Sequence, residues 1–409
     1  MQNDRSSQPR RSFLTGAAAA ASLAAAAAPL GLAQDSTAPI RTAHIGVGSR
    51  GSSLLRQVLS QPNVRVNAIC DADSLTRDQA LTAAARDNPK SVSEWRAVLD
   101  LKNVDAVYIA TPCDLHAEMA VAALEAGKHV YCEKPLGITP EQVDRVVKAA
   151  RRARGVIFQI GQQLRYFPAL QEAMAKIHDP ALLGARYIIK AQRHSSRSRA
   201  SAAAAAGETA QQRNRAAWYA DVKRSGDLIV ENSVHNIDAC NWIANSRPVS
   251  AYGHGKKYFP SPAIAPGTQM MDGYSVEYIY ENDMHLDYSQ VAFHARKLKE
   301  LPNGQWYTIY GEKGSVYLTH DSALFYDLHG DADPVDLLVD SKRIIADRTA
   351  RGIKEPDSAI ENFFACIREK RQPAASVTVG AVAALTAILG REAIYKRRMV
   401  TWKELGVEV

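Results

Sequence analysis

Three side chains that could do chemistry share one short stretch of the chain, Gly226 to Asp238. If this stretch is helical, Glu231, His235 and Asp238 fall at positions i, i+4 and i+7 and lie on one face. Histidine can exchange a proton near neutral pH, and a carboxylate one turn away could orient its ring. We therefore interpret His235 as a general base and Glu231 as its partner. The alternative is a hydrogen-bonded histidine at a helix interface, and a metal site is disfavoured because this face carries one histidine.

A glycine-rich stretch nearer the start of the chain predicts a nucleotide site. An apolar run that begins at Arg41 ends in the spacing G-x-G-x-x-G, and a helix-like run, Ser52 to Leu59, follows at once. The first glycine permits a tight turn, the second lets a pyrophosphate approach the backbone, and the third lets helix and strand pack closely. The phosphates would lie on the free N–H groups at the start of the helix. The predicted cofactor contacts are Gly46, Gly48, Ser49, Arg50 and Gly51.

An acidic residue strengthens this prediction and bears on the choice of cofactor. The apolar run Val64 to Cys70 ends at Asp71, which follows the last glycine by roughly 20 residues. An acid there can hydrogen-bond both hydroxyls of an adenosine ribose and would repel a 2′-phosphate, so it favours NAD while leaving NADP open. The alternative role for Asp71 is to cap the next helix, although Asp73 could do that instead.

Two more polar stretches follow predicted strands, where ligands of a parallel sheet bind. Lys134 lies in Tyr131 to Leu136, and its cation could steady an alkoxide or hydrogen-bond a sugar hydroxyl. The second stretch is Ala110-Thr111-Pro112, where Pro112 would end the strand and shape a loop under the nicotinamide ribose. The alternative for both is an ordinary surface turn. The predicted cofactor contacts here are Thr111, Pro112, His116, Glu133 and Lys134.

The elements that would position these residues fall into two groups. From Arg41 to about Ile160, short apolar runs alternate with helical patterns, which predicts an α/β fold with a doubly wound parallel sheet. The strands are expected at Val64 to Cys70, Val104 to Ala110, Lys128 to Cys132 and Val156 to Ile160, after the one before the glycines. The helices between them are expected at Ser74 to Arg86, Leu115 to Ala126 and Glu141 to Arg154.

From Ala185 onward longer strand-like runs appear, several of them alternating apolar and polar residues. They predict an open, largely antiparallel sheet with one covered face, interrupted by one helix over Asp227 to Ile243. Two helices, Ser358 to Glu369 and Val379 to Arg397, close the chain, and 195–217 is interpreted as a mobile or partly helical insertion. The strands are expected at Arg186 to Gln192, Val249 to Tyr258, Tyr274 to Tyr280, Met284 to Phe293 and Gln305 to Tyr310.

The first 33 residues are interpreted as an export signal rather than as part of the fold. Arg10-Arg11-Ser12-Phe13-Leu14 is a twin-arginine pattern, an alanine-rich stretch follows, and Gly31-Leu32-Ala33 resembles a cleavage site. No later run reaches membrane-spanning length, so we expect a soluble protein exported through the twin-arginine route. Such substrates cross the membrane already folded, which would let the protein carry a tightly held cofactor out of the cell.

Composition excludes several other classes. The 409 residues suggest two domains, and a 46% apolar share supports substantial cores. The formal charge of +7 is dispersed, without a basic cluster interleaved with aromatics, so nucleic acid is not expected as a partner. The five cysteines are far apart and form no CxxC pair, so we expect buried free thiols and no metal site.

Taken together, these stretches resemble the glucose–fructose oxidoreductase, inositol dehydrogenase and rhizopine-catabolism family, Gfo/Idh/MocA. The residues that carry the resemblance are IGVGSRG, Asp71, IATPCDLH, CEKPLG and GDLIVENSVHNID, in that order. The resemblance implies a Rossmann domain at 40–160. It also implies a substrate and oligomerisation domain at 161–403 with an open antiparallel sheet, on which homo-oligomers often form. The closing helices could pack back on the first domain.

The resemblance also implies a nicotinamide cofactor and a sugar, polyol or glycoside as substrate. Lys134 would correspond to the family's EKP lysine and His235 to its proton-transferring histidine, whereas Glu231 stands where many members carry aspartate. The predicted substrate contacts are Lys134, Arg165, Tyr166, Glu231, His235 and Asp238, with Arg193, His194, Trp218 and Tyr219 as further candidates.

Three functions remain open from the sequence. The cofactor could be recycled by a second substrate, which makes the protein an oxidoreductase. It could instead be recycled by the same sugar through oxidation, elimination of the aglycone, addition of water and re-reduction, which makes the protein an NAD-dependent glycoside hydrolase. A non-catalytic, cofactor-holding protein is the third possibility, but it would be expected to lack Lys134 or His235, and both are present.

Overall fold

Six short strands form a parallel sheet in the first part of the chain. The computed structural model describes residues 38–196, 218–260, 267–295, 298, 304–343 and 358–409. The strand order β3-β2-β1-β4-β5-β6 is that of a doubly wound sheet, as predicted. The strands are β1 (Ile40–Ile45), β2 (Val64–Cys70), β3 (Lys90–Val92), β4 (Ala106–Ile109), β5 (His129–Cys132) and β6 (Phe158–Ile160). The twin-arginine stretch and most of the 195–217 insertion lie outside the described residues.

The helices of this part follow the predicted alternation with small shifts at their ends. The expected helix over Ser74 to Arg86 stops earlier, at Ala83, and a single 3₁₀ turn, Ala85–Asp87, follows it. The strand β3 was not predicted, because three residues are too few to show a period. The helices are α1 (Ser49–Leu59), α2 (Ser74–Ala83), α3 (Arg96–Leu99), α4 (His116–Glu125) and α5 (Pro140–Arg152).

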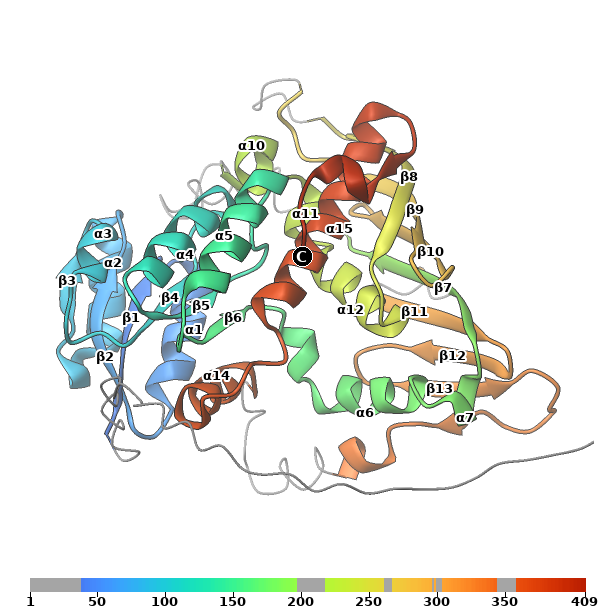
Figure 1. Cartoon of the computed structure of the whole chain (residues 1–409), viewed down its shortest axis with the longest axis horizontal. Coiled ribbons are helices and arrows are strands. Elements are labelled where there is room, and N and C mark those ends of the chain that lie inside the picture. The colour runs from blue at the N-terminus through green and yellow to red at the C-terminus, as the bar shows by residue number, and fades with distance from the viewer. Residues whose placement is uncertain (1–37, 197–217, 261–266, 296–297, 299–303, 344–357) are drawn as a thin grey trace, which may run out of the picture. The chain divides into compact units, whose positions relative to one another are not determined.

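Nine strands form the second sheet, in the order β14-β13-β12-β11-β7-β10-β9-β8-β15. The pairs are antiparallel except for β10 with β7, so the sheet is mixed but largely antiparallel, as expected. Figure 1 shows its strands fanned out beside α12. The strands are β7 (Arg186–His194), β8 (Pro248–Lys256), β9 (Gly273–Tyr280), β10 (His285–Val291), β11 (Gly304–Gly311), β12 (Gly314–Leu318), β13 (Ala323–Asp327), β14 (Val335–Asp336) and β15 (Val400–Thr401).

The long helix α15 (Val377–Lys396) packs against both sheets. A Cβ on Gly380 would lie 3.1 Å from Ile160 of β6, and one on Gly390 would lie 2.1 Å from the Tyr278 hydroxyl of β9, so the two glycines permit this close packing. Among the described residues, α15 is the one helix long and apolar enough to cross a membrane, so the prediction that no later run reaches membrane-spanning length is wrong. Of its apolar window 67% is buried, so packing in the core accounts for its composition.

The helix predicted over Asp227 to Ile243 is broken into two. The structure has α11 (Leu228–Glu231) and α12 (Val234–Ala244), and Asn232 and Ser233 form a turn between them. The Ser233 hydroxyl bonds to Tyr274 and Gln290, which lie on strands far along the chain. Because of this turn, Glu231 does not share a continuous helical face with the residues of α12, and that prediction is wrong.

Aromatic side chains pack between the parallel sheet and α14 (Ser358–Glu369). The His44 ring of β1 stacks on Tyr108 at 4.8 Å, and Tyr108 in turn meets the edge of Phe363 from α14 at 5.5 Å. His44 is 1% exposed, and neither ring nitrogen has a hydrogen-bond partner in the part of the chain that the structure describes. Desolvation lowers the pKa of His44 to about 3, so the ring is neutral in the folded protein. The five cysteines are buried free thiols, as expected.

The buried His44 should make the fold sensitive to acid. Its folded-state pKa of about 3 lies below the ordinary value of 6.5, so the unfolded chain binds the extra proton as pH falls between these values. Stability is therefore lost on acidification, by about 2 kcal/mol at pH 5 from this group. We expect His44→Phe to shrink the difference between urea-unfolding free energies at pH 7.5 and pH 5. His254→Phe, at an exposed position of β8, controls for loss of a histidine. An equal pH dependence in both variants would contradict this account.

Candidate active site

The glycine turn between β1 and α1 is tight and closely packed. Gly46 has a φ of +83°, and a Cβ there would lie 2.7 Å from the Ala110 carbonyl oxygen. A Cβ on Gly51 would lie only 2.0 Å from the Gly46 carbonyl oxygen. Helix α1 begins at Ser49 without a side-chain cap, so the N–H groups of its first turn are available to an anion. This cradle fits a dinucleotide pyrophosphate.

The carboxylate of Asp71 lies beside this turn. Its Oδ2 accepts a hydrogen bond from the Val47 N–H at 2.9 Å, and its Oδ1 accepts one from the Asp73 N–H at 3.0 Å. The cap of α2 is Asp73, whose carboxylate accepts from the Thr76 N–H at 2.7 Å. The structure therefore separates the two roles: Asp73 caps the helix, while Asp71 joins the end of β2 to the glycine turn.

The histidine after the Thr111-Pro112 turn lies in the protein interior. His116 is 1% exposed, and its ring nitrogens lie 2.9 Å from the Thr111 carbonyl oxygen and 2.8 Å from the Pro135 carbonyl oxygen. Both nitrogens are therefore engaged by the protein. His116 was predicted as a cofactor contact, but in the structure it bonds to the protein itself. It holds together the two loops that follow β4 and β5.

The two charged residues after β5 reach in different directions. The Glu133 carboxylate accepts from Arg50 Nε of α1 at 2.7 Å. The Lys134 ammonium donates to the Glu231 carboxylate at 2.8 Å and to the Glu231 carbonyl oxygen at 2.6 Å. Burial raises the pKa of Glu231 and is the largest single effect, but Lys134, with smaller contributions from Tyr219 and Arg193, lowers it overall. The predicted partner of His235 is therefore paired with Lys134 instead.

His235 lies on the first turn of α12 and is half-buried. Its Nδ1 lies 3.1 Å from Gln162 Oε1, just after β6. With the amide oxygen as acceptor, Nδ1 carries the proton and Nε2 keeps a lone pair. Desolvation, together with the cations of Lys134 and Arg193, lowers the pKa of His235 well below its ordinary value. The ring is therefore neutral at neutral pH and able to accept a proton.

Three of the predicted substrate contacts are engaged elsewhere. Asp238 is 1% exposed and accepts from Arg165 Nε and Nη2 at 2.8 and 2.9 Å, so it pairs with Arg165 rather than with His235. The Tyr166 ring is buried, and its hydroxyl accepts from the Ala375 N–H at 3.0 Å. The Arg165–Asp238 pair lines a cavity of about 200 Å³ together with Trp242. These three residues thus serve packing between η3 (Gln163–Tyr166), α12 and the start of α15.

A hydrogen-bonded polar network behind His235 was largely missed by the sequence interpretation. Arg193 Nη1 donates to Asn236 Oδ1 at 3.0 Å, and Asn236 Nδ2 donates to Gln305 Oε1 at 2.8 Å. Gln305 Oε1 also lies 3.3 Å from His320 Nε2. Only Arg193 was a candidate. Asn236 lies on α12 directly after His235, whereas Gln305 lies on β11 and His320 follows β12, and no local motif joins these two to the site. Among the described residues, no group of three or more His, Cys, Asp or Glu side chains could hold a metal ion.

The other candidates lie around this network. The His194 ring packs against His294 at 4.7 Å and against the Trp306 edge at 4.9 Å. The rings of Trp218 and Tyr219 meet at 5.7 Å, and the Tyr219 hydroxyl contributes to lowering the pKa of Glu231, after the larger effects of burial and Lys134. Of these candidates, Tyr219 therefore lies beside Glu231.

Two family models match the chain, one for each sheet. Residues 40–162 match the oxidoreductase family with an NAD-binding Rossmann fold, and residues 189–317 match the GFO/IDH/MocA C-terminal domain. The solved oxidoreductase domain protein from Kribbella flavida has a TM-score of 0.72 at 21% identity, covering 89% of this chain and 99% of its own. A levoglucosan dehydrogenase in complex with NADH and levoglucosan has a TM-score of 0.71 at 19% identity over the same shares. These likenesses show the fold.

Curated relatives match over shorter stretches. An inositol 2-dehydrogenase of Saccharopolyspora erythraea is 30% identical over 211 residues, which are 51% of this chain and 55% of that protein. A glycosyl hydrolase family 109 protein of the same organism is 32% identical over 157 residues, 37% of this chain and 34% of that protein. The chain thus spans between a third and just over half of the length of these relatives.

The buried pair of Lys134 and Glu231 should show the energetics of an ion pair shielded from water. Lys134→Met leaves a buried carboxylate without its cation, so we expect a loss of about 3 kcal/mol of unfolding free energy. The double variant with Glu231→Met should regain most of that loss, because no unpaired charge remains. Lys190→Met, which breaks the exposed Lys190–Asp287 pair at 3.1 Å, should cost less than about 1 kcal/mol. If the two lysine variants lose equal stability in urea unfolding, the pair does not have this role.

Proposed function

The chain belongs to the Gfo/Idh/MocA family, and from this premise we propose that it is a nicotinamide-dependent oxidoreductase acting on a sugar, polyol or glycoside. One observation carries the proposal. Lys134, at the end of the parallel sheet that bears the glycine turn, is bonded to Glu231, four residues before His235. A cation and a neutral base therefore lie together beside a cradle that fits a dinucleotide.

In the proposed mechanism, bound NAD supplies the hydride acceptor. His235 takes the hydroxyl proton of the substrate at Nε2, while Gln162 holds the ring in the tautomer that leaves this nitrogen free. Lys134 has three N–H donors and uses two on Glu231, so one remains for the substrate oxygen as it gains alkoxide character. Glu231 keeps Lys134 charged and fixed in place.

We propose NAD rather than NADP as the natural cofactor. Asp71 already presents its carboxylate beside the glycine turn, where a 2′-phosphate would meet a like charge. The oxidised and reduced forms would both stay bound, because an exported enzyme has no free nucleotide pool to draw on.

Export itself is proposed from the sequence. The twin-arginine pattern at Arg10 and Arg11, the alanine-rich stretch and the small residues up to Ala33 support the periplasm or another exported location. Replacing both arginines with lysine should leave the uncleaved chain in the cytoplasm, which cell fractionation can detect.

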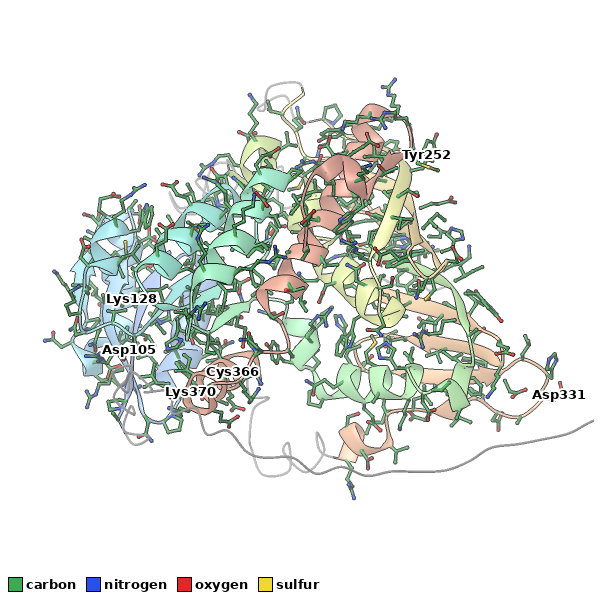
Figure 2. The ribbon with its side chains drawn as sticks, in the orientation of Figure 1. Asp105, Lys128, Tyr252, Asp331, Cys366 and Lys370 are labelled. Atoms are coloured by element: carbon green, nitrogen blue, oxygen red, sulfur yellow. The ribbon has the colours of Figure 1, made fainter. Side chains whose placement is uncertain are left out.

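We also propose that the chain forms homo-oligomers through the open face of the nine-stranded sheet. Ile279, Tyr310 and Tyr326 are exposed and lie on one cross-strand row, and Tyr252 on β8 is 53% exposed (Figure 2). Such an apolar and aromatic row is typical of a surface that associates. The mass in solution, compared with that of Tyr310→Glu, tests this proposal.

An NAD-dependent glycoside hydrolase is the second candidate. The resemblance to glycosyl hydrolase family 109 proteins over 157 and 139 residues favours it. The same base and cation would serve, because transient oxidation acidifies the neighbouring C–H and the returning hydride restores the cofactor. The two candidates differ in whether an aglycone is released.

The role of His235 predicts a selective kinetic defect. His235→Asn removes the proton acceptor, so we expect kcat to fall about 10²- to 10⁴-fold while the affinity for nucleotide is kept. In the wild type, the loss of activity at acid pH should occur below the ordinary histidine pKa of 6.5, because the pKa of His235 is lowered. His178→Asn, whose ring bonds to the Trp242 carbonyl oxygen at 2.8 Å, is the matched control. A kcat unchanged in His235→Asn would refute this assignment.

The function as a whole is tested on the nucleotide that co-purifies. We expect denatured protein to release NAD or NADH, identified by mass and absorbance, and expect sugars or polyols to reduce the bound nucleotide. Aryl glycosides then separate the two candidates: aglycone release without added NAD favours the hydrolase, and no release across a broad panel favours the oxidoreductase. A protein without affinity for any pyridine nucleotide would end both.

A further inference from the structure

The guanidinium of Arg193 lies against the turn that carries the proposed catalytic residues. Its Nη1 donates to the Asn232 carbonyl oxygen at 3.1 Å and to Asn236 Oδ1 at 3.0 Å. Asn232 directly follows Glu231, and Asn236 directly follows His235. Arg193, on β7, is therefore held beside both groups by two bonds from a single nitrogen.

The other cationic side chains described around the proposed site each form an ion pair with a carboxylate. Lys134 pairs with Glu231 at 2.8 Å, Arg50 with Glu133 at 2.7 Å and Arg165 with Asp238 at 2.8 Å, as already described. Arg193 differs, because no Asp or Glu of the described residues lies within salt-bridge distance of it and both of its acceptors are neutral oxygens.

The histidines near Arg193 do not change this balance. Desolvation lowers the pKa of both His235 and His320, and the Arg193 cation lowers both further. Both rings are thus neutral at neutral pH. The Arg193 cation also acts on Glu231, but that carboxylate already pairs with Lys134, so the described groups of the proposed site carry one more positive charge than negative.

The geometry leaves that charge open to a ligand. A guanidinium carries five N–H groups, and the two bonds of Arg193 use those of Nη1 alone. Arg193 is half-buried, and neither Nε nor Nη2 is among the buried polar atoms of the described chain that lack a partner, so both remain accessible. Their fork matches the two oxygens of a carboxylate or phosphate. A neutral side chain could tether the turn equally well without the cost of a partly desolvated charge.

We propose that Arg193 binds an anionic group of the substrate, so that the sugar is an acidic one, carrying a carboxylate or a phosphate. The proposal rests on the proposed function, and it narrows the substrate class of that same site. In this proposal Arg193 recognises the anionic group and His235 takes the proton. The anionic group would therefore be a substituent near the reacting carbon, not the group that reacts.

The test compares one hexose with its uronic acid, its aldonic acid and its 6-phosphate, using the protein with its nucleotide bound. Calorimetry gives affinity, and reduction of the bound nucleotide gives kcat and KM. We expect the wild type to prefer at least one acidic form over the neutral hexose by about 10- to 100-fold, mainly through KM, as for a charge-assisted hydrogen bond. Comparison of the two sugar acids with the 6-phosphate shows whether the anion that Arg193 binds is a carboxylate or a phosphate.

Variants then assign that preference to Arg193. Arg193→Met should abolish the preference for the acidic sugar, because use of the acidic sugar falls more than use of the neutral one, and Arg193→Lys should restore part of the preference. Arg186→Met, on the same strand and bonded among the described residues only to the Ile177 carbonyl oxygen at 3.3 Å, is the matched control and should behave as wild type. Thermal unfolding of each variant checks that it is folded.

Two results would overturn the inference: equal affinity of the wild type for neutral and acidic forms, or an equal loss on both in Arg193→Met, which would make Arg193 a structural tether. Failure of the proposed function gives a different result, in which no sugar of either kind reduces the nucleotide. Calorimetry would still decide the anion question then, because binding needs no turnover.

Discussion

One buried ion pair sets the geometry on which the proposed chemistry depends. Lys134 follows the parallel sheet, Glu231 ends α11 beneath the second sheet, and the two bonds between them hold these segments together. Water is largely excluded, with 14% and 11% of the two side chains exposed, so neither charge can be lost without leaving the other unpaired. The position of His235, four residues after Glu231, follows from this pair. If either sheet shifted, the base His235 would be separated from the Lys134 cation.

Adjacent residues extend this constraint in two directions. Glu133 holds Arg50 in the first turn of the nucleotide-facing helix, while Lys134 holds Glu231 on the substrate side. A third pair, Arg165 with Asp238, ties the segment after β6 to α12. Because each pair joins elements far apart in sequence, the ion pairs that line the proposed site also hold the surrounding helices and strands in place. This explains why residues predicted as substrate contacts, Arg165 and Asp238 among them, form ion pairs within the protein instead.

The sequence revealed those parts of the fold whose signal is local. The strand Val64–Cys70 has the predicted bounds, and the glycine turn has the expected close approaches, because period and spacing encode both. The pairing of Glu231 was missed for a non-local reason. Helical spacing suggested His235 as its partner, but Ser233 bonds to residues on β9 and β10 and the helix breaks there. Likewise no motif joins Gln162 to His235, since their 3.1 Å contact exists only after the segment following β6 packs on α12.

The charge environment of His235 also bears on how the cofactor would be recycled. Burial and the neighbouring cations of Lys134 and Arg193 disfavour the imidazolium, so a proton taken from a substrate is held weakly. In the proposed mechanism, a weakly held proton would be readily returned to a carbonyl oxygen when the substrate is reduced, and the Lys134 cation would stabilise the alkoxide in both directions. The lowered pKa of His235 therefore favours the reductive half-reaction over the oxidative one. That bias would help a protein that must complete both half-reactions on one bound nucleotide, because the second half-reaction regenerates the oxidised form.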